Sequence, residues 1–112
     1  MDTKDFALYL DPPAGSAGAP AFRRVVPLPD SNQGQISIIY DNFGTSGLTP
    51  VGVKVRINGV LQSPDLMISS PGKTPVHSLS SGDTVASFDV TPPTDSSGNI
   101  VRPSLAVLVE YQ

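Results

Sequence analysis

The 112-residue chain contains no cysteine and no tryptophan, and it has only one histidine and one glutamate. Without cysteine, neither a disulfide framework nor a thiolate metal site is possible. The single histidine, His77, also excludes a zinc site that needs two imidazoles. The sequence therefore predicts no metal ligands and no cofactor.

Positive charge is scarce as well. Seven Lys and Arg leave a formal net charge of -3 and a pI of about 4.7, and only Arg23 and Arg24 are adjacent. No basic stripe with interleaved aromatic residues is present, so we expect no nucleic-acid partner and no attraction to anionic lipid.

Long apolar runs are also missing. No run approaches the length that spans a bilayer, and the stretch after Met1 lacks the basic and apolar regions of a secretory signal. We therefore expect no membrane partner, and a protein that stays in the cytoplasm where it is made or in a particle assembled there.

Twelve prolines and ten glycines exclude long helices and leave short segments that suit strands. In VGVKVRING, Val51, Val53, Val55 and Ile57 share one face, and Asn58-Gly59 is typical of a two-residue hairpin turn. Alternation and apolar clustering predict strands at 5–10, 22–28, 35–40, 51–57, 60–62, 84–90 and 104–111, with a further short strand at 65–69. Residues 69–75 are predicted as a loop.

These strands predict an all-β fold, a single β-sandwich of immunoglobulin-like or jelly-roll kind with about seven short antiparallel strands. Pro27 predicts an edge position for its strand. The last strand is apolar on both faces, which predicts a central strand covered on both sides. Residues 1–20 are predicted to be an N-terminal strand and a Pro/Gly/Ala-rich arm outside the core, and 21–112 the sandwich domain.

No pattern of catalytic residues is found, and we expect a protein that is not an enzyme. His77 lies in PVHSLSS without a surrounding motif, which favours an ordinary loop or strand-end histidine. The nine aspartates mostly sit beside Pro, Gly, Ser or Asn, where they cap turns. The stretch Asp95 to Asn99 has oxygen side chains spaced as in a calcium loop, but it lacks the bidentate glutamate that follows in such loops.

Aromatic residues divide into two groups. Alternation places Phe6, Phe22, Phe88 and Tyr111 in the core. Tyr9, Tyr40 and Phe43 remain as candidate surface aromatics, and Phe43 in the loop DNFGTSG is the one most suited to a lectin-like contact.

The segment LSSGDTVASFDVTPP, Leu79 to Pro93, resembles the late strands of immunoglobulin-like β-sandwiches, as do VGVKVRING and SLAVLVEY. Together these cover about a third of the chain. The resemblance implies an architecture, and many unrelated functions use it.

A second resemblance is to small cement, or decoration, proteins of tailed-bacteriophage capsids. It rests on a short chain starting at Met1, the absence of cysteine, mild acidity, the all-β pattern and the arm from Pro12 to Pro20. The resemblance implies a homo-oligomer, a dimer or trimer, that binds the major capsid protein or another virion protein at the capsid surface.

Our leading hypothesis is therefore a non-enzymatic structural protein that cross-bridges capsomers. The alternative is an immunoglobulin-like binding module of a phage tail or cell-surface appendage that recognises glycan or receptor through loops near Phe43 and Asp95. The candidate partner-binding residues are Phe6, Tyr9, Pro12, Pro13, Pro20, Phe43, Lys54 and Arg56. For Lys54 and Arg56, a solvated outer face is the simpler interpretation.

Overall fold

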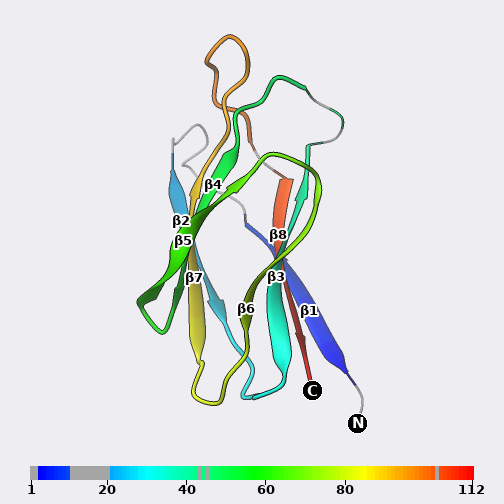
Figure 1. Ribbon diagram of the computed structural model, residues 1–112, viewed down its shortest axis with the longest axis vertical. Coiled ribbons are helices and arrows are strands. Elements are labelled where there is room, and N and C mark those ends of the chain that lie inside the picture. Colours follow the sequence, from blue (N-terminus) through cyan, green and yellow to red (C-terminus); the bar gives the residue numbers. More distant parts are fainter. Residues whose placement is uncertain (1–2, 11–20, 43, 45, 103) are drawn as a thin grey trace.

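The computed structural model describes residues 3–10, 21–42, 44, 46–102 and 104–112. It contains eight strands and, within these residues, no helix. The strands are β1 (Lys4–Tyr9), β2 (Phe22–Pro27), β3 (Gly34–Asp41), β4 (Val51–Ile57), β5 (Val60–Ile68), β6 (Gly72–Ser78), β7 (Val85–Thr91) and β8 (Ser104–Tyr111). They form two antiparallel four-stranded sheets packed face to face, which confirms the predicted β-sandwich (Figure 1).

The strand order is that of a jelly roll. Sheet A runs β1-β8-β3-β6 and sheet B runs β2-β7-β4-β5. The first four strands pair with the last four in nested order, β4 with β5, β3 with β6, β2 with β7 and β1 with β8. The chain is thus one long hairpin rolled into two sheets, and the order differs from the ABED and CFG sheets of immunoglobulin domains.

The tip of this rolled hairpin is the turn at Asn58 and Gly59. Both residues have positive φ, 52° and 82°, as a two-residue type I′ turn requires. The predicted hairpin is confirmed. Every other connection along the chain passes from one sheet to the other.

Two strand predictions are wrong. β5 does not end before Ser63 and Pro64. Its pairing with β4 shifts register between Val53 and Val55, so residues 63–65 bulge out of the ladder and the strand continues beyond them. The predicted loop 69–75 contains the start of β6, which is an exposed edge strand. Its residues do not alternate between apolar and polar, so the sequence pattern does not indicate a strand there.

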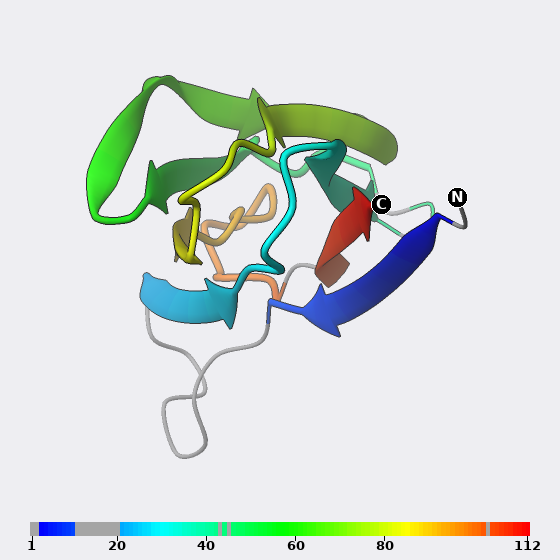
Figure 2. The same cartoon turned by 90° about the horizontal axis from the view of Figure 1, so that it is seen from below.

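The edges of the two sheets lie in pairs. Figure 2 shows β1 and β2 along one side of the sandwich and β5 and β6 along the other. Pro27 lies in edge strand β2 and β8 lies centrally in sheet A, as predicted.

β1, predicted as part of an N-terminal extension, pairs with β8 and leads into Leu10, which is buried in the common core. Residues 11–20, the rest of the predicted arm, lie outside the described residues.

The core fills the space between the sheets. Its buried hydrophobic members are Leu10, Phe22, Val26, Ile36, Ile38, Tyr40, Val51, Val53, Val55, Ile57, Ile68, Leu79, Ala86, Phe88, Val90, Leu105, Val107 and Val109. Phe6 and Tyr111 are partly buried and pack edge to face at its border, with ring centroids 6.2 Å apart. The assignment of Tyr40 to the surface is wrong, since only 3% of this residue is exposed. Its alternation with Ile36 and Ile38 is the signal that places it inside.

Gly34, where β3 begins, is a position that other residues cannot occupy without rearrangement. Its φ is 155°, and a Cβ there would collide with the Glu110 carbonyl oxygen and lie 2.8 Å from the Tyr111 Cα. We predict that Gly34→Ala lowers the free energy of unfolding by at least about 2 kcal/mol, because the clash is with backbone. Urea unfolding would measure this loss.

The matched control is Gly52→Ala in β4. Its Cβ would lie 3.4 Å from the Thr91 Cβ, an ordinary contact, and its φ is not in the left-handed region. Equal losses for the two variants would contradict the prediction.

Candidate functional site

The predicted partner-binding residues separate onto different surfaces. Phe6 points toward the core border, whereas Tyr9 lies on the outer face of sheet A and is 70% exposed. Lys54 and Arg56 lie on the outer face of sheet B. Pro12, Pro13, Pro20 and Phe43 lie outside the described residues. The structure therefore offers two outer faces to consider.

The outer face of sheet B carries a strip of paired charges. Asp89 on β7 accepts hydrogen bonds from Arg23 on β2, Nε to Oδ1 at 2.6 Å and Nη2 to Oδ2 at 3.2 Å, and another from Arg56 Nη1. Beside them, Lys54 Nζ lies 3.6 Å from Asp65 Oδ2. The hydrogen bonds from Arg23, and then those from Arg56, outweigh partial burial and lower the pKa of Asp89.

This strip has little charge left for a partner. Each predicted cation already has a carboxylate within the chain: Lys54 pairs with Asp65 on the next strand, β5, and Arg56 pairs with Asp89 on β7. A role for the two cations in partner binding stays a prediction. The ion pairs of Asp89 could not be predicted from the sequence pattern, because they depend on how β2, β7 and β4 align in the sheet.

The outer face of sheet A is apolar over its upper half. Tyr9 and Ile39 flank Ala106, while Ala7 lies opposite Leu108 in the adjacent row. We call these five residues the outer patch of sheet A. Four of them, all except Leu108, border a hollow of about 410 Å³ that Asp41 and Ser104 also line.

The outer patch corrects the prediction that the last strand is covered on both sides. Ala106 and Leu108 are half-buried, but by side chains of neighbouring strands, and no element of the described chain packs over this face (Figure 2). Sequence alternation reports only that a face is apolar. Whether a second layer covers that face depends on the tertiary fold.

Below the patch, the outward-facing Ser37 is fully buried. Leu108 and Pro75 flank it on the two neighbouring strands. Lys73 Nζ bonds Glu110 Oε1 at 2.6 Å, and the register makes this pair cross β3 diagonally over Ser37. Within the described part of the chain, the Ser37 hydroxyl has no hydrogen-bond partner.

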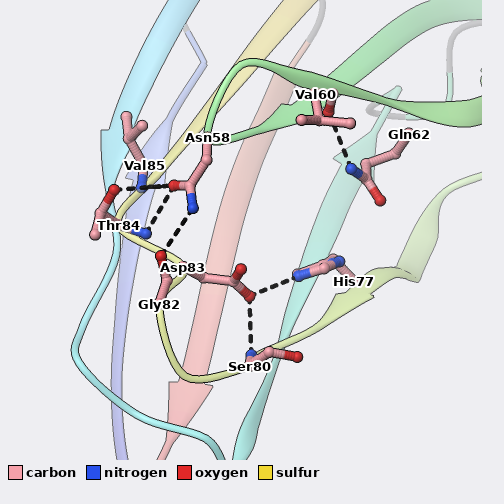
Figure 3. Close-up of polar contacts among 9 residues, drawn as sticks. All are labelled: Asn58, Val60, Gln62, His77, Ser80, Gly82, Asp83, Thr84 and Val85. Carbon is pink, nitrogen blue, oxygen red and sulfur yellow. Dashed lines mark hydrogen bonds and ion pairs between the residues drawn. The ribbon is translucent and has the colours of Figure 1, made fainter.

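His77 lies at the opposite end of the sandwich from the β3–β4 loop, in a network that closes the β6–β7 loop (Figure 3). Its Nε2 is 2.8 Å from Asp83 Oδ2, and the same carboxylate oxygen accepts the Ser80 backbone N–H at 2.8 Å. The hydrogen bond from His77 is the main cause that lowers the pKa of Asp83. The pair therefore holds a turn, and His77 lies one residue before the end of β6, which fits the predicted strand-end position and not a loop.

Asn58 extends this network to the hairpin tip. Its Oδ1 accepts hydrogen bonds from the Thr84 and Val85 backbone, at 2.9 and 3.2 Å, and its Nδ2 donates to the Gly82 carbonyl at 2.8 Å (Figure 3). The β4–β5 turn and the β6–β7 loop are thus joined by one side chain. The Asn-Gly signal reveals the turn but not this second role.

Asp95 is a turn-capping residue, as most aspartates were predicted to be. Its Oδ1 accepts the backbone N–H groups of Ser97 and Asn99, both at 2.9 Å, and these bonds lower its pKa, that from Asn99 most. In the described residues, no group of three or more His, Asp or Glu side chains gathers as metal ligands.

Comparisons with protein-family models, with curated proteins and with solved structures give no match to this chain. Among the described residues, no helix is long and apolar enough to cross a membrane.

The buried hydroxyl of Ser37 generates a stability prediction. Ser37→Ala should raise the free energy of unfolding by about 1 kcal/mol, because it removes a buried polar atom that lacks a partner. Urea unfolding would measure the gain. Ser87→Ala, on central strand β7 and half-buried, is the matched control and should give no gain. Destabilisation by Ser37→Ala would show that the hydroxyl is bonded after all.

Lowered aspartate pKa values predict the response to acid. A carboxyl whose pKa is lower in the folded than in the unfolded chain stabilises the fold above the unfolded value, 3.8, and this stabilisation is lost as the pH falls through the folded value. Unfolding free energy should therefore stay level from about pH 7 to 5 and fall below about pH 4.

Asp89→Asn should lower stability by about 1 kcal/mol at neutral pH and converge on the wild type in acid, where Asp89 is protonated. Chemical unfolding across this pH range is the measurement. Asp30→Asn, at an exposed position outside the network, is the control. A constant difference between Asp89→Asn and the wild type at every pH would rule out the linkage.

Proposed function

We propose that this chain is a non-enzymatic structural protein that binds the outside of a virus capsid and cross-bridges its subunits as a homo-oligomer. The partner is the major capsid protein or another virion protein, and the site of action is the virion surface. The bacteriophage decoration proteins that the sequence resembles supply this class of partner. Jelly rolls are also found among viral capsid domains, which is a supporting analogy at the level of fold.

The observation that carries the proposal is the outer patch of sheet A. Exposed apolar residues on sheet B, such as Leu61 and Met67, lie on either side of its charged strip. On sheet A the apolar side chains are contiguous, and contiguous exposed apolar surface marks protein-binding sites. Weak contacts of this size become strong when many symmetric copies bind one shell.

The alternative, recognition of a glycan or receptor, draws on the loops at the end of the sandwich where β3 ends and β8 begins, next to the outer patch. The β3–β4 and β7–β8 loops, which include Phe43 and Asp95, meet there: the Thr49 backbone N–H donates to the Thr94 carbonyl at 3.0 Å, and the Thr94 N–H donates to Thr49 Oγ1 at 2.8 Å (Figure 1). Such paired loops form one continuous surface. Lectin domains also use the jelly roll.

Co-sedimentation with particles from a lysate of the cells that make the chain tests the proposal. The wild type should travel with capsids at a fixed stoichiometry, and Ile39→Asp should weaken that binding by about tenfold or more, because a charge replaces an apolar side chain of the patch. Val25→Asp, at an exposed site on β2, is the matched control.

Deleting residues 1–20 is a poor test, because it removes β1 and the buried Leu10. A wild-type chain that travels with no particle would overturn the proposal. Retention on glycan by a monomer, lost in Phe43→Ala, would favour the alternative.

A further inference from the structure

The four sheet edges are not equally protected against another strand. β2, β5 and β6 contain Pro27, Pro64 and Pro75, and the ladders of β5 and β6 are also interrupted by register shifts. Proline and bulges are the devices that prevent strand addition. β1 contains no proline and keeps an unbroken register with β8 over all six residues. It is the edge most open to pairing.

The hydrogen-bonding groups on this edge can be assigned by alternation. The Leu10 N–H donates to the Leu105 carbonyl at 2.9 Å, so the even-numbered residues of β1 direct their backbone groups toward β8. The N–H and C=O groups of Asp5, Ala7 and Tyr9 therefore point away from β8, to the side on which the described residues form no further strand. Five of the six β1 residues are exposed, including Leu8 at 44%.

We propose that β1 pairs antiparallel with β1 of a second copy, with Ala7 opposite Ala7, to form a two-fold dimer with one continuous sheet. This deepens the proposed function, because it rests on the homo-oligomer named there and gives its interface. The second copy is favoured because the strand is complementary to itself in this register. All open backbone groups of Asp5, Ala7 and Tyr9 then find partners within β1 itself.

Neighbouring registers fit less well. A shift toward the N-terminus places Tyr9 opposite Thr3, outside β1, and a further shift sets the two Asp5 carboxylates against each other. With Ala7 on the two-fold axis, Asp5 faces the Tyr9 of the other copy, and Phe6 faces Leu8. The exposed Leu8 gains an apolar neighbour, and the two outer patches of sheet A join across the axis.

A cysteine cross-link tests the register, since the chain has no cysteine of its own. Directly opposed, hydrogen-bonded residues have Cα atoms about 5.5 Å apart, a separation that suits a disulfide. Ala7→Cys should form a disulfide-linked dimer about tenfold faster or more than Val25→Cys, an exposed residue on edge strand β2, because pairing raises the local thiol concentration.

Sedimentation of the purified protein completes the test. The wild type should run as a dimer, and Ala7→Lys, which sets two cations opposite each other, should run as a folded monomer, while Val25→Lys stays dimeric. A monomeric wild type, a dimer that persists in Ala7→Lys, or equal cross-linking at both cysteines would overturn the inference. A wild-type dimer that binds no particle would instead leave this interface intact and refute the capsid proposal.

Discussion

The turn at Asn58 and Gly59 is the constraint on which the rest of the fold depends. It brings β4 against β5, and the nested pairs β3–β6, β2–β7 and β1–β8 follow outward from it. The Asn58 side chain also holds the β6–β7 loop through Gly82, Thr84 and Val85. A tight turn with positive φ at both positions thus sets the register of β4 against β5, the innermost of the four nested strand pairs.

Rolling a long hairpin into two open sheets leaves four edges that must be kept apart from other chains. The prolines within strands all lie at these edges, where a missing N–H costs no ladder hydrogen bond. The ladder interruption in β5 leaves Pro64 outside regular pairing, and Pro75, paired opposite Ser37, lies beside the interruption in β6. Strand β1, which has neither a proline nor a register shift, is the exception, and an exception of this kind is where a functional contact is expected.

The two outer faces follow different physical rules. On sheet B, arginine and lysine are matched by carboxylates from other strands, so the face is polar and nearly neutral within itself. On sheet A, small and apolar side chains lie next to one another, and the ion pair of Lys73 and Glu110 closes the surface below them. The apolar side chains are contiguous only on the second face, which is why the proposed capsid contact and the proposed dimer both involve sheet A.

Local sequence determined the strand alternation, the Asn58-Gly59 hairpin, the edge position of Pro27 and most of the core, because each depends on neighbours within a few residues. Tertiary structure alone decided that β6 pairs at an edge, that Asp89 joins Arg23 and Arg56, and that Ala106 and Leu108 face outward with no layer of the described chain over them. These features depend on register between strands far apart in the chain. The alternation of a single strand cannot specify which strand lies beside it, or whether anything lies above it.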